Sequence, residues 1–303
     1  MGSPFRLVRV DLGAAKARIP VSEFGSGTGK RFLVTAGMDG DEYAGIEAAY
    51  ALAQRLDTEE IQGRVTVIPI VNVPGFESET SANPLDGRLP KAFFPGKATG
   101  TPTERLVDWL ARTYALQADA WLDLHDGAFA ERLRPFVWTW ETGAAAADAF
   151  TAACLAKLPC ERFVREKAAR GSKPSRLAEV GCAYVLSESG ERGRRDPEAI
   201  ARHLCVAEGI MAILGLSRTP TPDPRPLTPR TFRRLSYLSA PADGLWRPVP
   251  LSGTLRKGDL LGHAVSVDGK ARPLRSPATG VPLWWKETMR MRKGEVLCAI
   301  GVE

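Results

Sequence analysis

Hydrophobic residues along the first two thirds of the chain form alternating strand and helix patterns. The run Phe32–Ala36 is apolar and β-branched, which is typical of a buried central strand, and Gly37 ends it. From Asp41 the apolar positions repeat at helical spacing as far as Leu56, and Val65–Val71 then returns to a buried-strand pattern. This order predicts a β-α-β unit.

The same alternation continues to about residue 216. The further expected strands are Phe5–Val10, Pro20–Glu23, Ala120–Leu124, Arg134–Trp140 and Ala183–Ser187. The further expected helices are Thr103–Gln117, Ala144–Leu158 and a helix between Asp196 and Gly215. Strands that alternate with helices predict an α/β fold with a mostly parallel or mixed sheet flanked by helices.

The pattern changes in the last third of the chain. Ser217–Thr231 is too rich in proline for a helix or a central strand, and we expect a stiff linker there. Beyond it, short apolar runs are separated by glycine turns, which predicts a small all-β, barrel-like domain. We therefore divide the chain into an α/β domain at 1–216, a linker at 217–231 and a β domain at 232–303.

Composition narrows the classes of function. Of the 303 residues, 44% are hydrophobic and 25% are charged, which is typical of a globular protein. The net charge of +6 is scattered and forms no basic stripe, so we expect no nucleic-acid partner. Without a leader or a long apolar stretch, we expect no membrane partner and a cytoplasmic location. Five cysteines without a Cys-x-x-Cys spacing favour reduced thiols.

The glycine-rich segment Gly25–Lys30 could suggest a phosphate-binding loop. It lacks the P-loop spacing, however, and a strand follows it where a phosphate cradle requires a helix. We expect a hairpin loop there instead.

Two acidic residues, Asp39 and Glu42, follow the first central strand where the next helix begins. Ligand sites of open α/β sheets collect at such strand ends, and both carboxylates can bind a divalent metal ion. The alternative is that they only complement the dipole at the start of the helix.

Two later strand ends carry further candidates. His125 is one of three histidines and follows the strand Ala120–Leu124, so it should project from the same sheet edge as Asp39. Glu188 ends the strand Ala183–Ser187 and could serve as a general base. Two carboxylates and one imidazole around a metal ion would leave a position for water, as hydrolytic sites require.

These residues, in this order, resemble the succinylglutamate desuccinylase/aspartoacylase family of the zinc carboxypeptidase-like superfamily. The family motif Gly-x-His-Gly-x-Glu corresponds to Gly37–Glu42, and Asp-Leu-His-x-Gly corresponds to Asp123–Gly127. The family's catalytic glutamate falls on Glu188. The tail from Arg233 resembles the family's small β domain, which is similar to a biotinyl/lipoyl barrel.

The resemblance implies a deacylase or amidohydrolase that uses metal-activated water and Glu188 to cleave an amide or ester of a small acylated amino compound. It implies one divalent ion, zinc first of all, bound by Asp39, Glu42 and His125. Asp39 departs from the family histidine, and its added negative charge could favour a harder ion such as manganese.

The resemblance also indicates where the small-molecule substrate binds. The positions concerned are Lys91, Arg88, Glu77, Asn83 and Asp126. Acidic residues replace family arginines at Glu77 and Glu79, which favours a cationic or amine-bearing substrate unless these side chains point to solvent.

Two other functions stay open. The chain could be a catalytically impaired relative that binds a small ligand in the same cleft, because the family histidine and arginines are lost together. The terminal β domain could instead act as a scaffold, although it lacks the lysine setting of a lipoyl carrier. The sequence does not fix the oligomeric state, and a homo-oligomer is one outcome.

Overall fold

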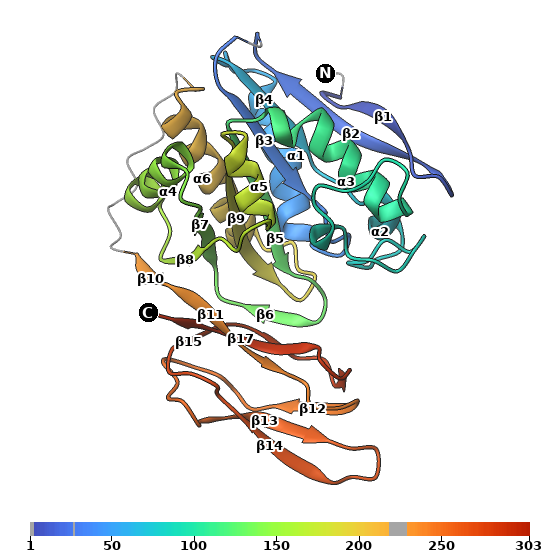
Figure 1. Cartoon of the computed structure of the whole chain (residues 1–303), viewed down its shortest axis with the longest axis vertical. Helices are drawn as coiled ribbons and strands as arrows, with labels where there is room; N and C mark the ends of the chain where they lie inside the picture. The colour runs from blue at the N-terminus through green and yellow to red at the C-terminus, as the bar shows by residue number, and fades with distance from the viewer. Residues whose placement is uncertain (1–2, 27, 218–228) are drawn as a thin grey trace.

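A nine-stranded mixed sheet forms the centre of the larger part of the protein (Figure 1). The computed structural model describes residues 3–26, 28–217 and 229–303. The strand order is β1-β2-β4-β3-β5-β9-β7-β8-β10. The bounds are β1 Arg6–Asp11, β2 Lys16–Phe24, β3 Arg31–Ala36, β4 Arg64–Ile68, β5 Ala120–Gly127, β7 Phe136–Glu141, β8 Arg162–Lys167, β9 Ala183–Glu191 and β10 Arg230–Phe232.

The four central strands, β4, β3, β5 and β9, run parallel to one another. Strand β2 is antiparallel to β4, and β7 is antiparallel to β9, so the sheet is mixed. Because parallel strands end at the same edge, the segments that follow β3, β5 and β9 lie close together there. The register pairs His125 of β5 with Glu188 of β9.

Helices cover both faces of this sheet. The bounds are α1 Tyr43–Leu56, α2 Val73–Glu77, α3 Pro102–Thr113, α4 Ala145–Lys157, α5 Lys173–Glu179 and α6 Pro197–Leu214. Helices α1, α4 and α6 share one hydrophobic core with Val34, Leu122 and Val185. On the opposite face, α3 and α5 pack over Leu33 and Trp121. The prediction of a mixed sheet flanked by helices is confirmed.

The structure contains the helix caps that the sequence predicts. Thr101 and Glu104 form a capping box at the start of α3, and the Asp196 side chain accepts a hydrogen bond from Glu198 N at the start of α6. Helix α6 ends at Gly215 in the left-handed conformation. Among the described residues, no helix is long and apolar enough to cross a membrane.

Several local predictions were wrong. A hairpin was expected around Gly25–Lys30, but the flanking strands β2 and β3 are not paired with each other, because β4 lies between them in the sheet. The helix expected to reach Gln117 ends at Thr113, and a 3₁₀ turn, η2 (Ala115–Gln117), follows it. Strand β8 and helix α5 were not predicted, because α5 has only seven residues and β8 mixes polar and apolar positions without alternation.

The carboxyl-terminal part consists of two four-stranded antiparallel sheets, β11-β17-β15-β6 and β14-β13-β12-β16. Their bounds are β6 Glu131–Leu133, β11 Arg234–Ser239, β12 Gly244–Pro248, β13 Leu260–Val265, β14 Ala271–Arg275, β15 Val281–Lys286, β16 Arg290–Met291 and β17 Val296–Val302. The predicted all-β character is confirmed. Of the predicted linker, residues 218–228 lie outside the described part.

The two parts of the protein share both a strand and a hydrophobic core. Strand β6 directly follows the edge where β5 ends, yet it pairs with β15 of the carboxyl-terminal sheet (Figure 1). Phe136, Val164 and Phe232 of the large sheet pack with Leu235 and Leu283 of the small one. The terminal sheets are therefore held against the edge that carries the candidate residues.

Candidate metal centre

The loop between β3 and α1 is held in place by α2 and the segment that follows it. Gly37 has a φ of 60°, and its carbonyl oxygen accepts a hydrogen bond from Asn72 N. Gly40 N donates to Thr80 O, and a side chain at residue 40 would meet the backbone of Gly75 at 2.2 Å. Only glycine fits that approach, and the short loop carries Asp39 before it and Glu42 after it, both of which meet His125 of β5.

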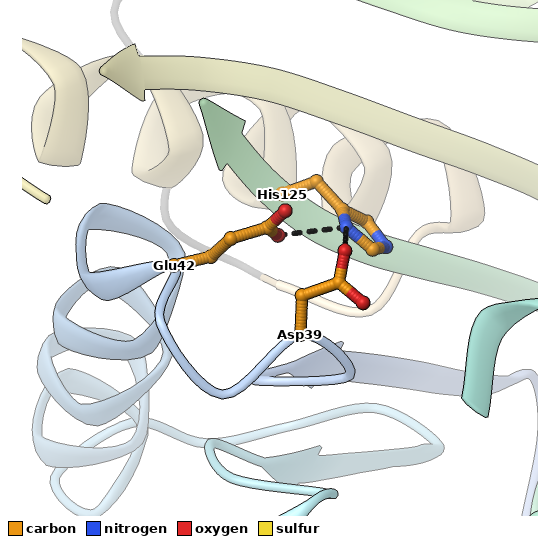
Figure 2. Close-up of side chains that lie close together, drawn as sticks. All are labelled: Asp39, Glu42 and His125. Carbon is orange, nitrogen blue, oxygen red and sulfur yellow. Dashed lines mark ion pairs between the residues drawn. The ribbon is translucent and has the colours of Figure 1, made fainter. Parts of the chain in front are cut away.

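Three buried side chains converge at this edge of the sheet. One ligand atom each from Asp39, Glu42 and His125 lies within 4.8 Å of the others. Figure 2 shows both carboxylates on the same side of the imidazole ring. His125 Nδ1 is 2.8 Å from Glu42 Oε2 and 4.0 Å from Asp39 Oδ2. The structure thus brings together the three residues that the sequence nominated as metal ligands.

The donor atoms suit a divalent ion. Asp39 Oδ1 is buried and has no hydrogen-bond partner among the described residues, and Glu42 Oε2 faces His125 Nδ1 without hydrogen-bond geometry. Buried oxygen atoms without donors are costly unless a ligand satisfies them. One imidazole and two carboxylates form a donor set used by zinc and by harder divalent ions.

Burial and crowding change the protonation of these groups. Burial lowers the pKa of His125, but the negative charges of Glu42 and Asp123 outweigh it and raise that pKa well above its usual value. Burial, together with repulsion from Asp39, raises the pKa of Glu42 well above its usual value. Without a metal ion, the cluster therefore holds protons that the bound ion would displace.

A lysine completes the cluster. The 3₁₀ turn η1 (Pro90–Ala92) places the Lys91 ammonium against Asp39 Oδ2. Burial opposes the charge on Lys91, but the charges of Asp39 and Glu42 raise its pKa. Burial likewise raises the pKa of Asp39, but Lys91 and His125 lower it below its usual value. Lys91 thus balances the negative charge that Asp39 adds.

Glu188 lies beside the cluster on the neighbouring strand. It is paired in register with His125, and the described residues donate no hydrogen bond to its carboxylate. Burial raises its pKa to about 8, although the charges of His125 and Lys91 oppose the shift. A carboxylate with a pKa near neutrality is suited to accept and return a proton.

Further buried residues lie on the Nε2 side of the imidazole ring, opposite the two carboxylates. Asp123 Oδ2 is 3.3 Å from His125 Nε2, without hydrogen-bond geometry, and Asp123 accepts hydrogen bonds from Thr35 Oγ1 at 2.6 Å and Tyr184 Oη at 2.9 Å. Lys173 Nζ lies 3.5 Å from the same Oδ2. A carboxylate on the far nitrogen of a ligating histidine is a common feature of metal sites.

The remaining predicted substrate residues lie outside these contacts. Asp126 accepts hydrogen bonds from Ala44 N at 2.8 Å and Ala128 N at 2.7 Å, which fixes the start of α1. The side chains placed elsewhere are Asn83, which caps a turn through Leu85 N; Arg88, which lies over the Phe93 ring; and Glu77, which is exposed at the end of α2. Of this group, only Lys91 joins the cluster.

Glu131 was not predicted as a site residue, because it stands in the short strand β6, which carries no motif. It is paired in β6 with Lys286 of β15. Burial raises the pKa of Glu131 to about 7, and the nearby charges that act on it are Lys91, Asp39 and Lys286. The pairing with β15, and not the local sequence, places this carboxyl group near the cluster.

Known proteins resemble this chain in sequence over much of its length. Residues 28–214 match the succinylglutamate desuccinylase/aspartoacylase catalytic domain. The N-alpha-acetyl-L-2,4-diaminobutyric acid deacetylase of Halomonas elongata is 32% identical over 185 residues, which are 60% of this chain and 54% of that protein. The match thus spans about half the length of that relative.

Solved structures share the fold over nearly the whole chain. The succinylglutamate desuccinylase/aspartoacylase of Rhodobacter sphaeroides has a TM-score of 0.84 at 25% identity, covering 98% of this chain and 94% of that one. The product-bound ectoine utilization protein EutE (DoeB) of Ruegeria pomeroyi has a TM-score of 0.84 at 21% identity and covers all of both chains. At 21% identity, the second comparison shows a shared fold only.

Proposed function

Because the chain belongs to the succinylglutamate desuccinylase/aspartoacylase family, we propose that it is a metal-dependent deacylase that hydrolyses the amide bond of a small acylated amino compound. The observation that carries the proposal is the buried convergence of Asp39, Glu42 and His125 beside Glu188. This arrangement joins a metal donor set to a carboxylate that accepts protons near neutral pH.

Each residue has a distinct part in this proposal. Asp39, Glu42 and His125 Nδ1 would hold one divalent ion, which when bound polarises the substrate carbonyl and acidifies water. Glu188 accepts the proton of the attacking water and passes it to the departing amine nitrogen. Lys91 offsets the charge of Asp39, so that the cluster carries less net negative charge than its carboxylates alone would give.

Zinc is the first candidate for the ion, and manganese is the second. Zinc accepts the imidazole and both carboxylates at short distances, and three protein ligands leave a position for water. The second carboxylate, supplied by Asp39 where the family has histidine, makes the donor set harder and improves the fit for manganese.

The neighbouring carboxyl groups also bear on the substrate. Glu188 and Glu131 lie near the cluster, and the side chain of Arg88 lies over the Phe93 ring, so a substrate with a free amine would meet two carboxyl groups that can accept hydrogen bonds from it. The relative from Halomonas elongata deacetylates N-alpha-acetyl-L-2,4-diaminobutyric acid, which carries such an amine. We propose acetylated diamino acids as the first substrates to test.

A binding function without catalysis is the second candidate. The Lys91 ammonium already contacts one of the three ligand residues, which is the observation that favours it. A ligand that enters the cleft would then meet an ion pair where the family holds a metal ion.

Metal analysis and turnover separate the two candidates. The purified protein should contain about one tightly bound divalent ion, and His125→Ala should remove it. His263→Ala, on β13 of the terminal sheets, is the matched control and should keep the ion. Hydrolysis of N-alpha-acetyl-2,4-diaminobutyrate should stop when the ion is removed and resume when it is restored.

Two results would count against a metalloenzyme. A protein that binds no ion, with hydrolysis unaffected by His125→Ala, contradicts the metal centre. A protein that binds an acetylated diamino acid but never cleaves it, whether loaded with zinc or manganese, supports the binding function instead.

A further inference from the structure

Asp123 is a buried carboxylate at which several donors meet. Its Oδ2 atom lies 2.9 Å from Tyr184 Oη, 3.3 Å from His125 Nε2 and 3.5 Å from Lys173 Nζ. Its Oδ1 atom accepts a hydrogen bond from Thr35 Oγ1 at 2.6 Å. Both Asp123 and Thr35 are fully buried. The contact of His125 Nε2 lacks hydrogen-bond geometry, so the hydrogen bonds that hold Asp123 come from the hydroxyl groups of Tyr184 and Thr35. The neighbours of these two hydroxyl groups decide which way their protons point.

Lys173 contacts the Tyr184 hydroxyl group. It is the first residue of α5, and its side chain is 13% exposed. Its Nζ atom lies over the rings of Trp121 and Tyr184, 4.9 and 4.6 Å from their centroids. Its ammonium donates to Tyr184 Oη at 2.9 Å. Lysine has no acceptor, so the single hydroxyl proton of Tyr184 must point to Asp123.

The same logic applies on the other side of Asp123. Trp121 Nε1 donates to Thr35 Oγ1 at 2.7 Å, and indole nitrogen is only a donor. The Thr35 hydroxyl proton must therefore also point to Asp123. With both hydroxyl groups donating to it, the Asp123 carboxylate is held in place 3.3 Å from His125 Nε2. A carboxylate at this position favours the ring tautomer with its proton on Nε2, which leaves Nδ1 to face Asp39 and Glu42.

We propose that Lys173 is a positioning residue for the metal centre: through Tyr184 it holds the Asp123 carboxylate beside His125 Nε2 and so presents His125 Nδ1 to the ion. This inference rests on the proposed function, since it assumes that the ion binds at Asp39, Glu42 and His125. Lys173 also supplies the positive charge nearest to the buried Asp123 carboxylate on that side. No motif in the sequence pointed to this lysine.

Metal affinity tests the role directly. We expect Lys173→Met, which keeps the length of the side chain but removes its charge and donors, to weaken zinc binding about 10- to 100-fold in competition with a chelator. Lys173→Arg, which keeps charge and donors, should retain most of the affinity. Lys157→Met, at an exposed site on α4, is the matched control and should bind zinc as the wild type does.

Tyr184→Phe tests the hydrogen-bond chain from Lys173 through Tyr184 to Asp123, independently of any folding defect in Lys173→Met. It keeps the ring but removes the hydroxyl group between Lys173 and Asp123, so zinc binding should weaken as well. Because both changes act through the same Asp123 oxygen, the double variant should lose less affinity than the product of the two single losses.

The outcomes are distinguishable from those of the proposed function. A wild-type protein that binds no divalent ion contradicts the proposed function and overturns this inference with it. If the wild type binds zinc but a folded Lys173→Met variant binds it equally well, only the role of Lys173 is overturned. If Lys173→Met does not fold, a Tyr184→Phe variant that binds zinc with wild-type affinity overturns the role of this hydrogen-bond chain.

Discussion

The Lys91 ammonium contacts the Asp39 oxygen, Oδ2, that faces His125 Nδ1, while the other oxygen of Asp39 has no partner among the described residues. The chain thus pairs the one departure from the family's ligand motif with a cation. Asp39 is almost fully buried, whereas the Lys91 side chain is 44% exposed. The lysine can therefore move toward solvent more easily than the aspartate can, which makes the ion pair separable.

Removal of Lys91 should strengthen metal binding. In Lys91→Met the ion no longer competes with an ammonium for Asp39, and we expect zinc affinity to rise about tenfold. The metal-free variant should unfold at a lower temperature, because a buried carboxylate loses its counter-charge. Calorimetric titration and thermal unfolding measure the two effects. Lys97→Met, exposed in the same loop, is the control, and unchanged or weaker binding in Lys91→Met would contradict competition.

Replacement of Asp39 by histidine should change metal preference. Asp39→His recreates the family's ligand set, removes one negative charge and softens the site, so the ratio of zinc to manganese affinity should rise at least about tenfold. Asp39→Asn is the control, because it removes the charge without supplying an imidazole, and it should weaken both metals. Competition titrations with each ion measure the ratio, and a preference that does not move would mean that residue 39 is no ligand.

Glu188 should be needed for turnover but not for metal binding. Loss of a general base typically costs about 10²- to 10⁴-fold in rate, and we expect Glu188→Gln to lower kcat within that range. The metal content should stay at the wild-type value, because Glu188 is outside the three-ligand set. Glu179→Gln, exposed at the end of α5, should keep full activity. A Glu188→Gln enzyme with normal kcat would exclude the role of base.

Metal binding should release protons at neutral pH. His125 and Glu42 form a buried pair in which the negative charge of Glu42 raises the pKa of His125 and burial raises the pKa of Glu42, so the metal-free pair holds at least one proton that the ion must displace. Affinity should therefore rise with pH, with about one or more protons released per ion at pH 7. Calorimetry in buffers of different ionisation enthalpy counts these protons, and a heat independent of the buffer would contradict the prediction.

The pH dependence of stability should report on Glu188. Its pKa rises from 4.5 to about 8 on folding, so between these values the folded state binds more protons than the unfolded state. The stability due to this group is then present below about pH 4.5 and is lost as pH rises toward 8. Metal-free wild type should lose up to about 2 kcal/mol relative to Glu188→Gln across this window, since the carboxyl group is partly exposed. Chemical denaturation measures the free energy of unfolding of both proteins. A difference between them that stays the same at every pH would contradict the prediction.

Much of the site could be predicted from the sequence because its signals are local. An apolar β-branched run such as Phe32–Ala36 makes a buried strand, and the cap at Asp196 begins a helix, whatever surrounds them. Parallel strands must end at one edge, so Asp39, Glu42, His125 and Glu188 could be expected together from the sequence. The residue types at those ends then indicated metal chemistry.

Only the tertiary structure decided which charges accompany that site. Lys91, Lys173 and Glu131 stand in a 3₁₀ turn, a short helix and a short strand, where no periodic pattern singles them out. Their positions follow from how these elements pack on others far away in the sequence, as when β6 pairs with β15. Hydrophobic periodicity specifies which face of an element is buried, but not which distant polar group that element meets. The sequence therefore determined the candidate ligand residues, and tertiary packing determined their counter-charges and their supporting hydrogen bonds.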